Sequence, residues 1–392
     1  MEDVYIVAAG RSAVGNFNGA LADLSAVELG SQVIKQLLDQ HNIDPTLVDE
    51  VILGHVLSAG CGQNTARQAS IHAGIGIATP ALTINKVCGS ALKAVHLATQ
   101  AIALGDAQLV VAGGMESMSQ SAHVLPQARR GKKMGNWELV DTMLHDGLQD
   151  AFKHYHMGIT AENLASQYGI SRSEQDEFAL SSQQKASAAI ANNRFDDEIL
   201  PIQVPQRRGD PIVVDRDEGP RPDASAELLA RLKPAFKEDG SVTAGNASGL
   251  NDGAAVVILC NKAMINHLGC KPLARVAAYA SSAVAPEIMG IAPVSATELC
   301  LKKAGWRLDD VDLIEANEAF AVQSLAVGKV LQWDATKVNV NGGAIAIGHP
   351  IGASGCRVLV TLIHEMLKRD SKKGLATLCI GGGQGVAIAI ER

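Results

Sequence analysis

The sequence predicts an α/β fold made of two duplicated layered domains with an inserted loop domain. The segment that starts at Leu24 is matched about 270 residues later by the segment that starts at Val294, and each reads as an amphipathic helix, a turn and a strand. Strands that alternate with helices of about 10 to 15 residues favour layered α/β domains, each with a largely parallel sheet. Residues 119–249 have no counterpart in the other half, so they are expected to form the insertion.

The elements of the two halves follow in the same order. Each half opens with an apolar strand, at residues 4–9 and 274–279, followed by the helix and strand described above. The second part of each half, at residues 81–114 and 337–383, reads as a strand, an irregular loop, a helix, a strand and a turn with glycines. A spacing this long indicates a domain duplication, since solenoid repeats recur every roughly 20 to 50 residues.

The insertion has a different character from the two halves. It contains a polar, helix-like stretch, for which Ser171 or Ser173 is the expected N-cap, and loops rich in proline and charge. The predicted boundaries are an N-terminal domain over 1–118 and 250–270, a loop domain over 119–249, and a C-terminal domain over 271–392.

The composition excludes several classes of protein. A chain of 392 residues is too long for a single small binding module, and 47% apolar with 19% charged residues is typical of soluble globular proteins. Only 3% aromatic residues and a net charge of -7 disfavour nucleic-acid binding. The richest basic cluster lies in a short loop at 129–133, where a solvated or subunit-contact role is favoured.

Targeting and metal signals are absent from the sequence. The seven cysteines include no C-x-x-C pair and the histidines do not cluster at ligand spacing, so neither a disulfide scaffold nor a metal site is expected. The start, MEDVYIVAAG, has no basic region before its apolar run, which argues against a signal peptide. No apolar run approaches the about 18 residues of a membrane helix. We expect a cytoplasmic protein that does not bind membranes.

Cys88 is the first candidate for a chemical role. It lies between a predicted strand and a helix that runs to Gly105, with Ser90 as the expected N-cap. A thiol at a helix N-terminus has a lowered pKa, and the thiolate is the nucleophile. A buried, inert cysteine is the alternative.

His349 lies in a loop, NGGAIAIGHPIGASG, that carries five glycines. A histidine between Gly348 and Pro350 does not fit a regular helix or strand, so the backbone presents its ring in a particular place. A dinucleotide-binding turn is the rival interpretation, but the glycines lack the G-x-G-x-x-G spacing that it requires.

Two further segments follow predicted strands. Cys379 precedes three glycines, Gly381 among them, whose N–H groups suit an oxyanion hole, although a plain hairpin fits equally well. Asn317 and Glu318 follow the strand VDLIEA, where open α/β sheets collect ligands; a buried asparagine that holds a turn is the alternative. All these segments could converge on one cleft.

Motifs along the whole chain carry a resemblance to a known family. They are NKVCGSALKAV, GGMESMS, HMGITAEN, TAGNASGLNDGA, NEAF, GHPIGASG and CIGGGQG, in that order. With these motifs the sequence resembles the thiolases, most closely the short-chain, biosynthetic-type acetyl-CoA acetyltransferases. The resemblance implies a thiolase fold and a ping-pong Claisen condensation of two acetyl-CoA to acetoacetyl-CoA and CoA, with thiolysis as the reverse.

The resemblance also implies roles for individual residues. Cys88 is the acylated nucleophile, His349 its proton acceptor, and Cys379 the base that deprotonates the second acetyl-CoA. Asn317 holds a water that forms one oxyanion hole with His349, and the N–H groups of Cys88 and Gly381 form the other. The residues implied to bind substrate or CoA are His156, Met157, Arg221, Phe236, Ala244, Ser248, Met289 and Phe320.

The resemblance implies a homotetramer, with the loop near Arg129–Met134 in the contact, and no cofactor other than the CoA thioesters that are substrates. Three alternatives remain at this point. A degradative 3-ketoacyl-CoA thiolase would accept longer chains. A non-catalytic acyl-CoA-binding protein would not need both thiols and the imidazole, and a cysteine peptidase would not use Cys379 or the insertion.

Overall fold

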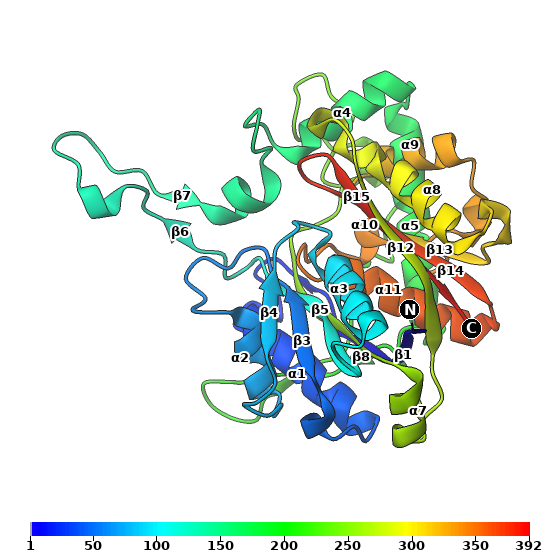
Figure 1. The fold of residues 1–392 in the computed structure, drawn as a ribbon. Coiled ribbons are helices and arrows are strands. Elements are labelled where there is room, and N and C mark those ends of the chain that lie inside the picture. Colours follow the sequence, from blue (N-terminus) through cyan, green and yellow to red (C-terminus); the bar gives the residue numbers. More distant parts are fainter. Residues whose placement is uncertain (1) are drawn as a thin grey trace.

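The computed structural model describes residues 2–392, and in this part of the chain most strands form one 11-stranded sheet (Figure 1). The two halves join edge to edge where β1 and β12 pair antiparallel through Tyr5–Arg275 and Ile6–Ala274. The first half contributes β1 (Tyr5–Ser12), β11 (Asn251–Cys260), β5 (Leu109–Ser117), β3 (Glu50–Gly54) and β4 (Ala81–Ile84). The second contributes β12 (Ala274–Ala283), β15 (Gln384–Glu391), β14 (Lys373–Ile380) and β13 (Leu313–Ala316). The short strands β2 (Gly15–Asn16) and β8 (Ile199–Leu200) complete the sheet.

The predicted duplication is confirmed by the strand order. Outward from the joint, the order is β1-β11-β5-β3-β4 in one half and β12-β15-β14-β13 in the other. In place of a counterpart to β4, the second half has a parallel bridge between Ile314 and Val338. The two halves therefore repeat the same sheet about an approximate twofold relation.

The expectation of largely parallel sheets is wrong. The pairs β1–β11, β5–β11, β12–β15 and β14–β15 are antiparallel, whereas β3–β4, β3–β5, β13–β14 and the short pair β1–β8 are parallel. The β14–β15 pair is a hairpin closed by the glycine triplet, in which Gly382 and Gly383 have φ of 85° and 83°. A tight hairpin requires antiparallel strands, whereas the periodicity of the sequence suggested helical crossovers throughout.

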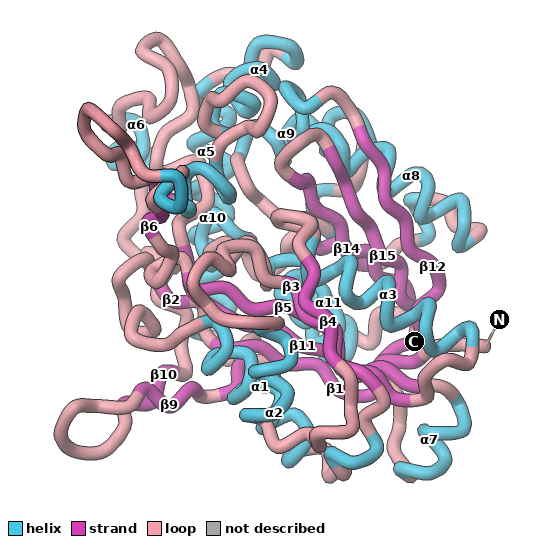
Figure 2. Tube along the Cα trace, turned by 60° about the vertical axis from the view of Figure 1, so that its left-hand side comes forward, coloured by secondary structure: helices cyan, strands magenta, loops and turns pink. Residues whose placement is uncertain are grey.

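Helices form layers on both sides of the sheets (Figure 2). α3 (Ser90–Leu104) and α11 (Ser354–Arg369) contact each other and strands of both halves, so they form the central layer. α1 (Ala26–Gln40) and α2 (Thr65–His72) cover the outer face of the first half, and α8 (Ala292–Ala304) covers that of the second. Since the loops that precede α3 and α11 carry Cys88 and His349, the central pair of helices brings these loops together.

The window Val87–Leu104, which includes α3, corrects one expectation from the sequence. These 18 residues have a mean hydropathy of 1.3, so by length and composition they could cross a membrane, contrary to the prediction that no stretch approaches this length. The window is 56% buried inside the protein, where α3 packs against β5, β3 and α11. Its apolar character therefore serves the core.

The insertion packs over one end of both halves and sends out an arm (Figure 1). The arm carries β6 (His123–Val124) and β7 (Val140–Asp141) and leads to a π-helical turn at Met143–Leu148. Ser171 begins α5 with a capping box to Glu174, so Ser171 and not Ser173 is the N-cap. The other insertion elements are α4 (Met157–Tyr168), α5 (Arg172–Ala191), β9 (Ile202–Val204), β10 (Ile212–Val214) and α6 (Ala226–Ala230). Elsewhere lie α7 (Lys262–Leu268), α9 (Ala321–Leu331) and α10 (Ala344–Ile347).

A buried ion cluster ties the insertion to β1. Arg11 is fully buried and donates through Nε to Glu198 (2.7 Å) and through both terminal nitrogens to Asp217 (2.7 and 2.9 Å). We expect Arg11→Ala to lower the free energy of unfolding by about 3–5 kcal/mol, because two buried carboxylates lose their partner. Urea unfolding measures this; Arg307→Ala, which breaks only the exposed pair with Asp309, is the control expected to change little.

Candidate active site

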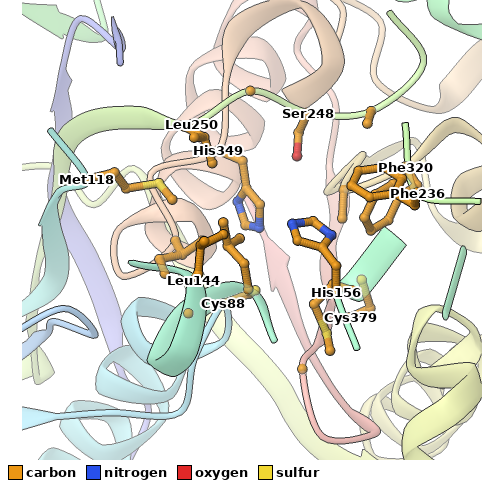
Figure 3. A pocket seen from close by; sticks show the side chains of 18 of the residues that line it. Cys88, Met118, Leu144, His156, Phe236, Ser248, Leu250, Phe320, His349 and Cys379 are labelled. Carbon is orange, nitrogen blue, oxygen red and sulfur yellow. The ribbon is translucent and has the colours of Figure 1, made fainter. Parts of the chain in front are cut away.

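A cavity of about 360 Å³ lies where the two halves and the insertion meet (Figure 3). Most residues singled out in the sequence line it. From the two halves these are Cys88, Met289, Phe320, His349, Cys379 and Gly381, and from the insertion His156, Met157, Phe236, Ala244 and Ser248. The sulfurs of residues 88 and 379 and the ring of residue 349 therefore share one space, as the expected convergence requires.

Two predicted site residues lie outside this cavity. Arg221 lines a neighbouring cavity of about 310 Å³, which shares Ala244, Ala247 and Gly249 with the first. Asn317 is fully buried behind the wall, with its side-chain amide 3.5 Å from Nδ1 of His349. Arg221 thus lines an adjacent cavity, and Asn317 lies against the imidazole.

The loop before α3 presents Cys88. Val87 has a φ of 47°, an uncommon conformation for a β-branched residue, and the chain turns sharply there. The prediction that Ser90 caps the helix is wrong, because Gly89 occupies the N-cap position. Ser90 instead accepts from the Lys86 amide (2.8 Å) and donates to the Val87 carbonyl (2.6 Å), so its hydroxyl fixes the turn that holds the thiol.

The electrostatics of Cys88 differ from the expectation. Burial raises the pKa of its thiol to about 11, although the backbone N–H groups of Gly381 and of Cys88 itself point at the sulfur and oppose this rise. The predicted lowering of the pKa by the helix N-terminus is therefore outweighed by desolvation. The two N–H groups are the pair expected to form an oxyanion hole, and both face the reactive position.

His349 is held with one ring nitrogen toward the cavity (Figure 3). Its Nδ1 is 2.5 Å from the Ser354 hydroxyl, which donates to the Pro350 carbonyl at 2.8 Å. A hydroxyl has one proton, so it accepts from Nδ1–H and leaves Nε2 as the free base. Burial, with a contribution from the positive charge of Arg357, lowers the pKa of His349 to about 3. The resting ring is neutral and able to accept a proton.

Cys379 ends β14 and is almost fully buried. Burial raises the pKa of its thiol far above the usual range, and the nearby charge of a Cys88 thiolate raises it further. Both thiols are therefore protonated in the resting protein, and each disfavours ionisation of the other.

Aromatic residues of the insertion close one side of the cavity. The ring of Phe236 stacks on His156 with centroids 4.5 Å apart, and meets Phe320 edge-on at 6.2 Å. His156 also begins α4, where its Nδ1 accepts from the Gly158 amide at 3.0 Å. These contacts fix the wall of the cavity from outside the duplicated halves.

Some lining residues were not predicted from the sequence. Leu144, Gly147 and Leu148 come from the π-helical turn of the insertion, for which the polar and irregular sequence gave no periodic signal. Met118 lies within the quoted GGMESMS motif, so that motif could have indicated it. The remaining unpredicted lining residues are Ala235, Ala247, Gly249, Leu250, Ala319 and Ile351.

The raised pKa of Cys88 predicts how its reactivity depends on pH. Below pH 11 the thiolate fraction falls about tenfold for each pH unit, because burial favours the neutral thiol. We therefore expect the rate of alkylation of Cys88 by iodoacetamide to rise continuously between pH 7 and pH 10. Peptide mass analysis after timed quenching measures this rate. A plateau reached below pH 8 would contradict the assigned environment.

Comparison with known proteins identifies the family to which this chain belongs. The family model for "Thiolase, N-terminal domain" matches residues 4–263, and that for "Thiolase, C-terminal domain" matches residues 270–392. The chain is 65% identical to an acetyl-CoA acetyltransferase of Pseudomonas aeruginosa and 62% identical to a probable acetyl-CoA acetyltransferase of Escherichia coli, over the full length of both chains in each case. The crystal structure of the Bacillus anthracis acetyl-CoA acetyltransferase matches with a TM-score of 0.98 and 48% identity, covering 100% of this chain and 99% of that one. The chain belongs to the thiolase family.

Proposed function

We propose that the protein is an acetyl-CoA C-acetyltransferase, which condenses two acetyl-CoA to acetoacetyl-CoA and CoA and catalyses the reverse thiolysis. The observation that carries this proposal is one cavity in which two thiols, a neutral imidazole and two backbone N–H groups meet. The names of the relatives at 62–65% identity over the full length support the choice of acyl group.

The first half-reaction is acetyl transfer to Cys88. Nε2 of His349 takes the thiol proton as the sulfur attacks the thioester carbonyl, and the N–H groups of Cys88 and Gly381 bind the negative oxygen of the tetrahedral intermediate. Each such donor contributes about 3 kcal/mol in other enzymes. The proton on His349 then passes to the leaving CoA thiolate. Attacking and leaving sulfurs have similar basicity, so the exchange is nearly symmetric.

The second half-reaction forms the carbon–carbon bond. Cys379 first loses its thiol proton to solvent; its thiolate then removes a proton from the α-carbon of a second acetyl-CoA, and the oxygen of the resulting enolate lies against His349 and a water held by Asn317. The α-carbon attacks the acetyl carbon, and Cys88 leaves as the thiolate. Acetoacetyl-CoA is released, the proton taken by Cys379 restores the resting thiol of Cys88, and Cys379 regains a proton from solvent.

The remaining cavity walls suit a CoA thioester as substrate. In this proposal His156, Met157, Met289 and Phe320, which line the cavity, contact the acyl end. Ser248, also in the lining, contacts the pantetheine chain, and Arg221 in the adjacent cavity contacts the nucleotide end. No resident cofactor takes part in these steps. The insertion thus acts as the CoA-binding loop domain.

The projecting arm is assigned to contact between copies of the chain in a homotetramer. It carries the loop Arg129–Met134, and the Met134 side chain is 89% exposed. An apolar side chain on an extended arm suits burial against another subunit. Sedimentation analysis of the chain and of Met134→Asp measures the oligomeric state and so tests whether Met134 lies in the subunit contact.

Intact mass after incubation with acetyl-CoA tests the function. The expected result is one acetyl group per chain, located on Cys88 and removed by added CoA. No adduct on Cys88 would overturn the acyltransferase proposal, and would favour a non-catalytic CoA-binding protein. An adduct that water removes as readily as CoA does would favour a hydrolase or peptidase.

Thiolysis rates separate the proposal from a degradative 3-ketoacyl-CoA thiolase. The acyl end of the cavity is enclosed by Met157, Met289 and Phe320, so a long chain meets side chains where a methyl group fits. We expect kcat/KM for acetoacetyl-CoA to exceed that for a long-chain 3-ketoacyl-CoA by at least about tenfold, the scale of hydrophobic-pocket discrimination. Comparable values for the two substrates would favour the degradative enzyme.

A further inference from the structure

The turn that follows His349 is docked on the half of the molecule that carries Cys88. Its Gly352 amide donates to Oε2 of Glu116 at 2.9 Å, although the two residues are 236 positions apart. Glu116 belongs to β5 and is completely buried. A side chain of one half therefore holds a catalytic loop of the other.

The same carboxylate holds the end of the neighbouring strand. Glu116 accepts from the backbone amide of Val56 through Oε2 at 3.2 Å and from that of Leu57 through Oε1 at 3.1 Å. The ring of His55 lies beside it, with Nε2 3.4 Å from Oε1. Three backbone donors from two segments converge on one buried acceptor, which makes their relative position well defined.

Glycines in the sheet make room for the docked turn. The Gly352 carbonyl lies so close to Gly114 and Gly54 that a Cβ on either would come within 2.1 and 2.7 Å of its oxygen. Next to these glycines is the start of α3, the helix that follows Cys88, since the same Cβ on Gly54 would meet Ser90 and Ala91. The backbone of the His349 loop thus fits a groove in the Cys88 half.

The held segments also form the wall beside the nucleophile. Ile351, the neighbour of Gly352, packs with Val56, Leu57 and Met118, and Cys88 packs against this cluster. Ile351 and Met118 line the cavity. A shift of the docked turn would therefore move both the imidazole and the surface next to the thiol.

We propose that Glu116 is a positioning residue that, with Gly54 and Gly114, docks the Pro350–Gly352 turn and so sets His349 against Cys88. Glu116 does not touch substrate in this scheme; it acts through the turn. The inference rests on the proposed roles of Cys88 and His349 but not on the identity of the acyl group.

The test measures alkylation of Cys88 by iodoacetamide at fixed pH, which needs no acetyl-CoA. His349→Ala sets the value expected when the imidazole is lost. Glu116→Ala is expected to lower the rate toward that value, by about tenfold to 10²-fold, the cost of misplacing a reacting group by about 1 Å. The kcat for condensation should fall by a similar factor, while KM for acetyl-CoA stays within about twofold because the CoA path is untouched.

Two further variants separate positioning from general destabilisation. Glu116→Gln keeps an oxygen for the Gly352 amide, so we expect it to retain most of the alkylation rate. Glu162→Ala is the matched control, because Glu162 accepts the backbone amides of Ser241 and Val242 inside the insertion. It should lower the melting temperature and leave alkylation of Cys88 within about twofold of the wild-type rate.

The outcomes distinguish the inference from the proposed function. Equal alkylation rates in Glu116→Ala, Glu162→Ala and the wild type would overturn the positioning role. If Glu116→Ala does not fold, Gly114→Ala decides instead: its Cβ should push the Gly352 carbonyl and lower the rate, and a folded variant with the wild-type rate would refute the proposal. A wild-type protein that forms no acetyl adduct would refute the function, whereas the alkylation rates would still decide the role of Glu116.

Discussion

Replacing Cys88 by serine is expected to lower kcat for acetoacetyl-CoA formation by at least about 10³-fold, the scale seen when an activated nucleophile is removed. A serine hydroxyl is far less acidic than a thiol, so transfer of its proton to the neutral imidazole of His349 costs much more free energy than transfer from Cys88. An acetyl ester on serine would also be a poorer donor than a thioester. The acetyl adduct seen by intact mass should disappear.

A matched control tests whether the loss of activity is specific to the thiol at position 88 or follows from the removal of any cysteine. Cys270 is a partly buried free cysteine outside the cavity, so Cys270→Ser should keep both the adduct and the wild-type kcat within about twofold. Measurable turnover of Cys88→Ser above about 10% of wild type would mean that another group accepts the acetyl unit. The acyl-enzyme proposal would then be wrong.

The catalytic segments were predictable because each carries its chemistry within a few residues. Cys88 and His349 stand in loops whose glycines and prolines rule out regular structure, Cys379 ends a strand just before three glycines, and the internal repeat puts these segments at strand or helix ends. Elements that depend on contacts distant in sequence could not be found this way. The β1–β12 joint involves only two residue pairs, and the antiparallel direction of β15 depends on a three-residue turn.

The pKa values and hydrogen bonds of the site were less predictable than the identity of the residues that form it. The sequence indicated a thiol at a helix N-terminus, which favours the thiolate, but burial depends on how many apolar side chains surround the sulfur in three dimensions. Ser90 shows the same limit at a smaller scale. Its position fits an N-cap, yet its hydroxyl donates to the carbonyl of Val87 in the tight turn there. No local sequence pattern predicts that turn. The role of Glu116 likewise becomes visible only when both halves are placed together.

The second thiol, Cys379, should be required for condensation but not for acetylation. We expect Cys379→Ala to form the acetyl adduct on Cys88 at a rate within about threefold of wild type, because His349 alone serves as base in that step. Condensation should fall by about 10²- to 10⁴-fold, the contribution of a well-placed general base. Rapid-quench mass measurement of the adduct, beside steady-state formation of acetoacetyl-CoA, separates the two steps.

Ionisation of the two thiols is coupled. A Cys88 thiolate raises the pKa of Cys379, so the second thiol resists ionisation while the first carries charge. Acetylated Cys88 cannot ionise, so at a pH near 11, where the free Cys88 thiol ionises, acetylation removes this repulsion and Cys379 ionises more easily. In the wild type at about pH 11, alkylation of Cys379 by iodoacetamide should therefore become faster after acetylation of Cys88. An unchanged or slower rate, with Cys379 still reachable by the reagent, would show that the two thiols do not communicate.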